Sequence, residues 1–217
     1  HEIRCAAVFQ PLSEWLRSAR RLTGTMVVCA EGDCGSCSVL IGRPRAGRID
    51  YRPVTSCIQY LAQLDGVHVV TVEGLKHEDR LNPVQEALVA EHGLQCGYCT
   101  PGFVVAMQAL FDESPTPSRG EACRALVGNL CRCTGYDAIL NSVGRVDRAG
   151  WKTVAELYPD PELQPILERA ARESVEITDG PRRMFKPATL DEAVRWRAAT
   201  PNATVLAGGT DLGVVWN

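Results

Sequence analysis

Eight of the ten cysteines fall into two groups of four, and this grouping constrains the fold more than any other feature. Ten thiols in 217 residues is above ordinary usage but below the density of a small disulfide scaffold. Clustered thiols in such a chain bind metal more often than they pair as disulfides. The fold therefore has to bring each group of four cysteines together at one site.

The first group has three cysteines in one loop and a fourth after 19 intervening residues: Cys29, Cys34, Cys37 and Cys57. The C-x4-C-x2-C spacing with a distant fourth cysteine is typical of plant-type [2Fe-2S] sites. Gly32 and Gly35 allow the tight turns that such a loop needs. Structural zinc is the alternative, although zinc ligands usually come as two knuckles of two.

The second group consists of two pairs separated by 31 residues: Cys96, Cys99, Cys131 and Cys133. Each pair ends in Cys-Thr at an expected helix start, followed by Gly and an aromatic residue. We expect an approximate internal two-fold symmetry, in which the two helix-opening turns face each other. A cluster buried between the two helix N-termini would be stabilised, because the helix dipoles favour its negative charge. A zinc ribbon remains possible from the spacing alone.

Cys5 and Cys123 belong to neither group. Cys123 lies in an expected helix beside alanines, which predicts a buried apolar thiol, and we expect the same of Cys5. The histidines share no ligand spacing and are predicted to be surface or loop residues: His1, His68, His77 and His92.

Residues 1–75 read as a small α+β unit. An amphipathic helix is predicted over 11–22, and β-branched or apolar runs predict strands at 38–41, 49–54 and 67–72.

Residues 76–147 read as a compact bundle of four short helices. The first is bracketed by Asn82-Pro83 and Gly93, and the second runs from Thr100-Pro101 to about 111. A capping box of Ser118 and Glu121 opens the third, which Gly128 closes. The fourth covers 136–143.

Residues 148–183 are rich in proline and predict an extended connector with one helix at about 162–173. A new unit follows at 184–217, with a helix through Leu190 and Trp196 and a strand at 204–207. The strand leads to Gly208-Gly209-Thr210-Asp211, a turn through which a diphosphate could approach the main chain. Taken alone, this turn equally fits a plain strand-to-helix connection.

The formal net charge of −3 lacks the basic excess of a nucleic-acid-binding protein. No apolar run is long enough to cross a bilayer, and the N-terminus has no signal-peptide core. We therefore expect no nucleic acid, no membrane and a cytoplasmic location.

Three segments resemble the iron–sulfur signatures of the molybdenum hydroxylases, the xanthine dehydrogenase and aldehyde oxidase family. They are residues 31–37, 95–103 and 128–136. The likeness covers residues 12–147 almost continuously. With the flavin-like start at 184–217, the chain is most similar to the iron–sulfur and FAD small subunit of bacterial xanthine dehydrogenase.

The resemblance implies a plant-type ferredoxin-like (β-grasp) domain at 1–75, a helical [2Fe-2S] domain at 76–147, a linker at 148–183 and an incomplete FAD domain at 184–217. It implies that Gln95 and Cys133 lie near the molybdopterin of a partner. The loop that it assigns to FAD comprises Val205, Leu206, Ala207, Gly208, Gly209, Thr210, Asp211 and Leu212.

The resemblance also implies a division of labour. A separate large subunit would hold the molybdopterin and hydroxylate a purine, and electrons would pass through the second cluster, the first cluster and FAD to NAD. We expect no catalytic acid or base on this chain, and a heterodimer that dimerises further. The alternatives are an aldehyde, CO or aromatic-thioester oxidising relative, and a zinc-stabilised interaction module without redox activity.

Overall fold

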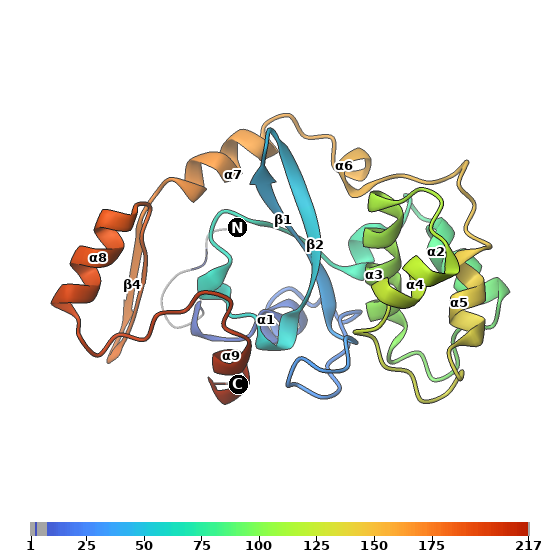
Figure 1. Ribbon diagram of the computed structural model, residues 1–217, viewed down its shortest axis with the longest axis horizontal. Helices are drawn as coiled ribbons and strands as arrows, with labels where there is room; N and C mark the ends of the chain where they lie inside the picture. Colours follow the sequence, from blue (N-terminus) through green and yellow to red (C-terminus); the bar gives the residue numbers. More distant parts are fainter. Residues whose placement is uncertain (1–2, 4–7, 217) are drawn as a thin grey trace.

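The protein is an elongated α+β molecule, as the sequence predicts (Figure 1). The computed structural model describes residue 3 and residues 8–216. A small sheet lies in the middle, with four helices on one side and a hairpin with a further helix at the other end. Whether the central part is a complete ferredoxin-like domain stays a prediction, as do the domain boundaries.

The central sheet consists of β1 (Ser38–Arg45), β2 (Arg48–Thr55) and β3 (His68–Val70) in the order β2-β1-β3, with both pairings antiparallel. All three predicted strands are therefore present. A two-residue turn joins β1 to β2, and both Ala46 and Gly47 have positive φ, as tight hairpins require. Three short 3-10 helices complete this part: η2 (Ser56–Ile58), η3 (Leu61–Gln63) and η4 (Val72–Leu75).

The two faces of the sheet bury different helices, because alternate residues of a strand point to opposite sides. On one face, Val39 and Ile41 pack with Leu12 and Leu16 of α1 (Leu12–Ser18). On the other, Leu40 joins the core of the helical part. Each face of the sheet therefore packs against a different hydrophobic core.

Helix α1 is shorter than the predicted 11–22. The chain turns back after it, since Arg17 Nη1 donates to the carbonyls of Thr23 and Thr25 at 2.7 and 2.9 Å. Arg21 then takes a positive φ of 57°, which no helix can continue through.

The four predicted helices of the middle region are confirmed as α2 (Pro83–Ala90), α3 (Thr100–Glu113), α4 (Arg119–Ala125) and α5 (Asp137–Val143). Asn82 and Ser118 form the capping boxes expected at the starts of α2 and α4. Helix α3 is buried on nearly all sides and supplies Phe103 and Phe111 to the core. Helix α4 ends at Ala125, three residues before the predicted closing glycine.

Beyond the four helices the chain forms α6 (Val154–Leu157), α7 (Leu163–Ala171), β4 (Val175–Asp179), β5 (Arg182–Lys186), α8 (Leu190–Ala199) and α9 (Thr210–Trp216). The helices predicted near 162–173 and 190–196 are present. Strand β4 starts within the predicted connector and pairs with β5. The strand predicted at 204–207 is wrong: this stretch has no strand partner, and the Val205 side chain is 74% exposed.

Two further predictions are corrected. Cys123 is exposed, because the buried face of α4 is formed by Ala122 and Leu126, four residues apart, and Cys123 points away from it. His68 is half-buried in β3 rather than at the surface or in a loop. Cys5 and His1 lie outside the described residues.

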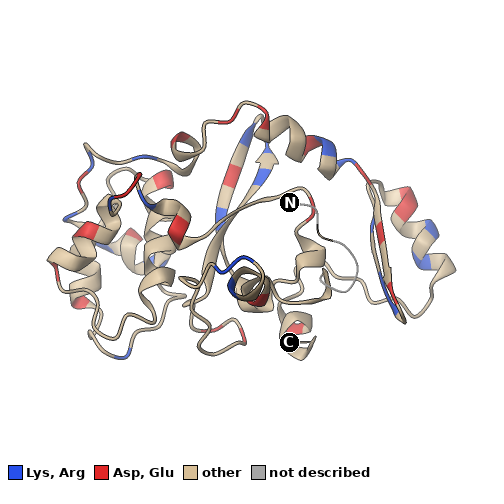
Figure 2. Ribbon diagram, turned by 180° about the vertical axis from the view of Figure 1, so that it is seen from behind, with Lys and Arg blue, Asp and Glu red and all other residues tan. Residues whose placement is uncertain are grey.

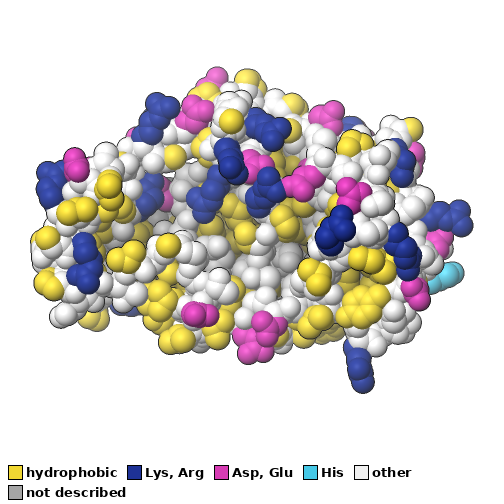
Figure 3. All heavy atoms as spheres, viewed as in Figure 1, with side chains coloured by type: hydrophobic (Ala, Val, Ile, Leu, Met, Phe, Trp, Pro, Cys, Tyr) yellow, Lys and Arg dark blue, Asp and Glu magenta, His cyan; other side chains and the backbone are white. Residues whose placement is uncertain are grey.

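Acidic and basic residues are both spread along the whole length of the molecule (Figure 2). Lys and Arg gather most visibly over the β1–β2 hairpin (Figure 3). None of the described helices has the length and apolar character needed to cross a membrane.

The segment after α5 is anchored on the sheet and on α3. The Tyr51 hydroxyl lies 2.7 Å from His68 Nδ1, and the Tyr158 ring meets His68 edge-on at 5.0 Å. Gly42 leaves room for this cluster, since a Cβ there would lie 2.5 Å from the Tyr51 ring. Asp112 of α3 accepts from Val154 N at 3.1 Å, and burial raises the pKa of this carboxyl to about 6.

We predict that the His68→Gln variant is less stable than the wild type at pH 7.5 and that this difference in stability shrinks as the pH falls. Burial lowers the pKa of His68, so the folded state binds fewer protons there than the unfolded chain, whose His pKa is about 6.5. The stability contributed by neutral His68 is therefore lost as the pH falls through about 6.5. Thermal melts from pH 7.5 to 5.5 should show the wild-type curve falling toward that of the variant. Asp112 titrates in both proteins and cancels; two parallel curves would contradict the prediction.

Candidate metal centres and cofactor loop

The first cysteine loop lies between α1 and β1 and is turned inward by positive φ angles at Ala30, Gly32 and Gly35. Gly32 has a φ of +86°, which favours glycine, and a Cβ there would lie 2.6 Å from Ile58 Cδ1 on the segment that carries Cys57. The predicted role of the two glycines is thus supported by their conformation. The loop forms a close cradle for a compact group.

The four thiols of the first quartet, three in this loop and Cys57 in η2, form two pairs. Three are buried and Cys29 is half-buried. The Cys57 thiol donates to Cys37, which lowers the pKa of Cys37 to about 6 and raises that of Cys57. Burial opposes ionisation of Cys29, but hydrogen bonds from the backbone of Glu31 and from Cys34 outweigh it and lower its pKa.

The second quartet also consists of two pairs. Cys133 Sγ lies 3.6 Å from Cys96 Sγ, and Cys99 interacts with Cys131. Burial, together with Cys131, raises the pKa of Cys99 to about 12, whereas hydrogen bonds from Thr134 overcome the effect of burial and lower the pKa of Cys131.

The predicted burial of the second quartet is only partly correct. Cys99 begins α3, as expected, and is half-buried with Cys131, but Cys96 and Cys133 are exposed. The fourth helix, predicted over 136–143, is present as α5, which begins at Asp137. One pair therefore faces the core and the other faces outward.

In the part of the chain that is described, no three His, Cys, Asp or Glu side chains are arranged to hold one metal ion. What the quartets offer is two thiol pairs each. Tetrahedral coordination at about 2.3 Å places two sulfur ligands of one metal about 3.8 Å apart. The Cys96–Cys133 distance of 3.6 Å is close to this value, so this pair suits one metal of a binuclear group.

The two quartets are joined by direct backbone contact. Leu130 N donates to Cys34 O at 2.9 Å, one residue before Cys131. The buried Asn129 side chain donates to Gly35 O at 3.2 Å. Gly102 of α3 closes the same junction, because a Cβ there would overlap Gly35 O. The structure thus brings together loops that lie about a hundred residues apart.

The loop predicted to hold FAD lies against the segment that follows Cys57. A Cβ at Gly213 would overlap Ile58 O, and Tyr60 meets Trp216 edge-on at 6.2 Å. Gln63 Nε2 donates to Gly208 O at 3.3 Å. Gly209 has a φ of +84°, which favours glycine.

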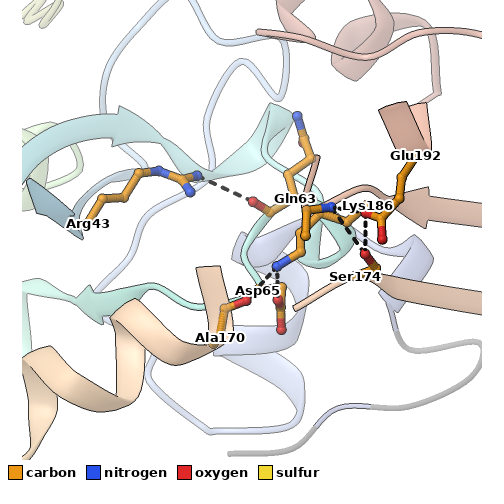
Figure 4. A network of polar contacts seen from close by, with 8 residues as sticks. Arg43, Gln63, Asp65, Ala170, Ser174, Lys186 and Glu192 are labelled. Carbon is orange, nitrogen blue, oxygen red and sulfur yellow. Dashed lines mark hydrogen bonds and ion pairs between the residues drawn. The ribbon is translucent and has the colours of Figure 1, made fainter. Parts of the chain in front are cut away.

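An ion pair holds the C-terminal unit in place (Figure 4). Lys186 Nζ of β5 lies 2.5 Å from Asp65 Oδ2 and donates to Ala170 O at 2.8 Å. Arg43 of β1 donates to Gln63 O in the same network at 3.3 Å. The sheet, α7 and the β4–β5 hairpin therefore meet beside the candidate FAD loop.

Sequence reasoning singled out the cysteines but missed the residues that join the quartets. Asn129 and Gly102 lie within two of the segments that resemble the iron–sulfur signatures, but nothing in those segments indicates that both residues contact Gly35. Gln63 and Asp65 lie far from any motif. Their roles come from contacts across the fold.

Residues 71–144 match the model of the [2Fe-2S] binding domain, and this segment contains the whole second quartet. The match and the thiol pairs define an iron–sulfur electron-transfer protein. A probable subunit of the xanthine dehydrogenase of Bacillus subtilis (strain 168) is 45% identical over 137 residues, covering 63% of this chain and 74% of that protein. The chain belongs to the molybdenum hydroxylase family.

Other relatives are longer. Aldehyde oxidase 1 of Cavia porcellus is 34% identical over 236 residues, which cover 89% of this chain but only 18% of that protein. Quinoline 2-oxidoreductase from Pseudomonas putida 86 has a TM-score of 0.55 at 35% identity, covering 74% of this chain and 85% of that one. The aldehyde oxidoreductase from Desulfovibrio gigas has a TM-score of 0.59 at 31% identity, covering 77% of this chain and 20% of that one.

We predict that Gly102→Ala destabilises the protein by about 1–3 kcal/mol, the usual cost of overpacking. Its new methyl group would press on Gly35 O and separate the two loops. Gly120→Ala in α4 is the matched control, since a Cβ there meets no atom closer than Arg124 Nη1 at 3.6 Å and helix propensity favours Ala by about 1 kcal/mol. Urea unfolding measures both. Equal effects of the two substitutions would show that the junction is not tightly packed.

Proposed function

We propose that this chain is the electron-transfer subunit of a molybdenum hydroxylase and holds one [2Fe-2S] cluster in each cysteine quartet. When bound, these clusters accept and release single electrons. The observation that carries the proposal is the hydrogen bond from Leu130 N to Cys34 O. It joins a ligand of the first site to the residue beside Cys131, so the two sites share a short bonded connection.

The arrangement of the thiols supports a two-iron group at each site. The first cluster would be held by Cys29, Cys34, Cys37 and Cys57, and the second by Cys96, Cys99, Cys131 and Cys133. Each iron would take two thiolates, in line with the pairs of each quartet. The closely packed first loop keeps water from its three buried thiols, whereas the second site faces outward.

The surface around the second quartet suits a large partner. Several exposed apolar residues lie close to Cys96 or Cys133 in the sequence: Leu94, Tyr98, Val127, Leu130 and Tyr136. Gln95 Nε2 donates to Cys133 O at 3.1 Å and lies on the same exposed segment. We assign this face to a molybdopterin-binding subunit, with Gln95 and Cys133 toward the pterin.

The loop from Val205 to Leu212 is proposed to hold the diphosphate of FAD. A Cβ at Gly208 would meet nothing within 4 Å, so its backbone is open to an approaching ligand. The packing of Gly213 on Ile58 keeps this loop beside Cys57. Electrons would therefore leave toward the flavin from the first site, and NAD would be the final acceptor.

Xanthine is the proposed substrate of the whole enzyme, because the bacterial relative with 45% identity is a probable component of a xanthine dehydrogenase. An aldehyde-oxidising enzyme is the second candidate, since aldehyde oxidases are 34% identical over most of this chain. The chain spans only 18% of those proteins. Turnover of xanthine against aldehydes by the assembled enzyme separates the two.

The proposed setting is the reducing cytoplasm, in a heterodimer that dimerises further. The nine described cysteines are all free thiols. Such a compartment keeps thiols available for iron.

We predict four irons and four acid-labile sulfides per chain. Dithionite reduction should give two distinct rhombic EPR signals at low temperature, one from each quartet. Cys131→Ala should remove one signal and about half of the iron, because it deletes a ligand of the second site alone. Cys123→Ala is the control, since this exposed thiol belongs to neither quartet, and it should keep both signals. A colourless preparation that contains zinc would refute the proposal.

A further inference from the structure

The hydroxyl of Thr134 lies against the sulfur of one cysteine of the second quartet. Thr134 Oγ1 is 3.2 Å from Cys131 Sγ, and Tyr136 N lies 3.3 Å from the same oxygen. The three groups form a short chain from the Tyr136 amide through the Thr134 hydroxyl to the Cys131 sulfur. Within this chain, the direction of each hydrogen bond can be worked out.

A hydroxyl has one proton to donate and lone pairs with which to accept. The Tyr136 N–H can only donate, so Thr134 Oγ1 accepts from it. The proton of Thr134 remains available, and a Cys131 sulfur that binds iron is a thiolate, which can only accept. Thr134 therefore donates to Cys131, and the amide behind it polarises the hydroxyl further.

The backbone at Tyr136 is held in an unfavourable conformation that maintains this chain. Its φ of +72° lies in the left-handed region, which is uncommon for a bulky residue. Two contacts hold it there: Tyr136 OH accepts from Cys131 N at 2.9 Å, and its ring meets Phe103 edge-on at 6.5 Å. The turn therefore makes hydrogen bonds to both the amide and the sulfur of Cys131.

The other half of the site lacks this contact, although the sequence repeats Cys-Thr there. Thr100 follows Cys99 as Thr134 follows Cys133, but the buried Thr100 Oγ1 has no hydrogen-bond partner among the described residues. The repeated dipeptide therefore gives two different environments. Only one threonine reaches a cysteine sulfur.

We infer that Thr134 is a positioning residue that raises the reduction potential of the second cluster through its hydrogen bond to Cys131 Sγ. The inference rests on the proposed function, which places a cluster at this quartet. Reduction adds one negative charge to the cluster and its thiolates. A donor aimed at a thiolate stabilises the more negative state, and hydrogen bonds to sulfur are among the factors that set these potentials.

The test is a redox titration of the full-length chain, followed by the low-temperature EPR signal of each cluster. Thr134→Val keeps the shape of the side chain and removes the hydroxyl, so the midpoint potential of the second cluster should become more negative. Thr134→Ser keeps the hydroxyl and should restore the wild-type value. Thr100→Val makes the same change where no sulfur contact exists, and its midpoint potential should stay at that of the wild type.

The signal of the first cluster serves as an internal reference and should not move in any variant. An unchanged midpoint in Thr134→Val would overturn the inference, as would an equal shift in Thr134→Ser or Thr100→Val. In each of these cases two signals in the wild type would leave the proposed function standing. A wild-type chain with iron in only one quartet would overturn both.

Discussion

The contact between the first cysteine loop and the segment before Cys131 is the constraint on which the arrangement of both sites depends. Leu130 N donates to Cys34 O, and Asn129 donates to Gly35 O. The two backbones approach so closely that a side chain at Gly102 would collide with Gly35. Because the Leu130–Cys34 bond joins two main-chain atoms, it holds the backbones of the two quartets together, and the Asn129 side chain adds a second bond.

The two sites differ in their exposure although both offer thiol pairs. In the first, Cys37 directly precedes β1, Cys57 lies in η2, and both are buried. In the second, Cys96 and Cys133 are exposed, and several residues near them in the sequence are exposed and apolar. The second site is therefore more open to solvent and to other molecules than the first.

The C-terminal unit is held beside the first site by few but specific interactions. The ion pair of Lys186 with Asp65 and the bond from Gln63 to Gly208 connect it to the end of η3 and to the segment that follows η3. Both contacts are at least partly exposed, so each contributes modestly. Their importance is geometric, since they place the open backbone of Gly208 near the residues that follow Cys57.

The sequence alone determined features that depend on local chemistry: the cysteine spacing, the capping boxes at Asn82 and Ser118, and the positive φ of Gly32 and Gly35. Local patterns failed where a distant partner decides the outcome. No strand pairs with 204–207, and the face of α4 that packs inward leaves Cys123 outside. The junction of the quartets and the different surroundings of two Cys-Thr pairs arise only in the tertiary structure, because their contacts join residues that no local periodicity relates.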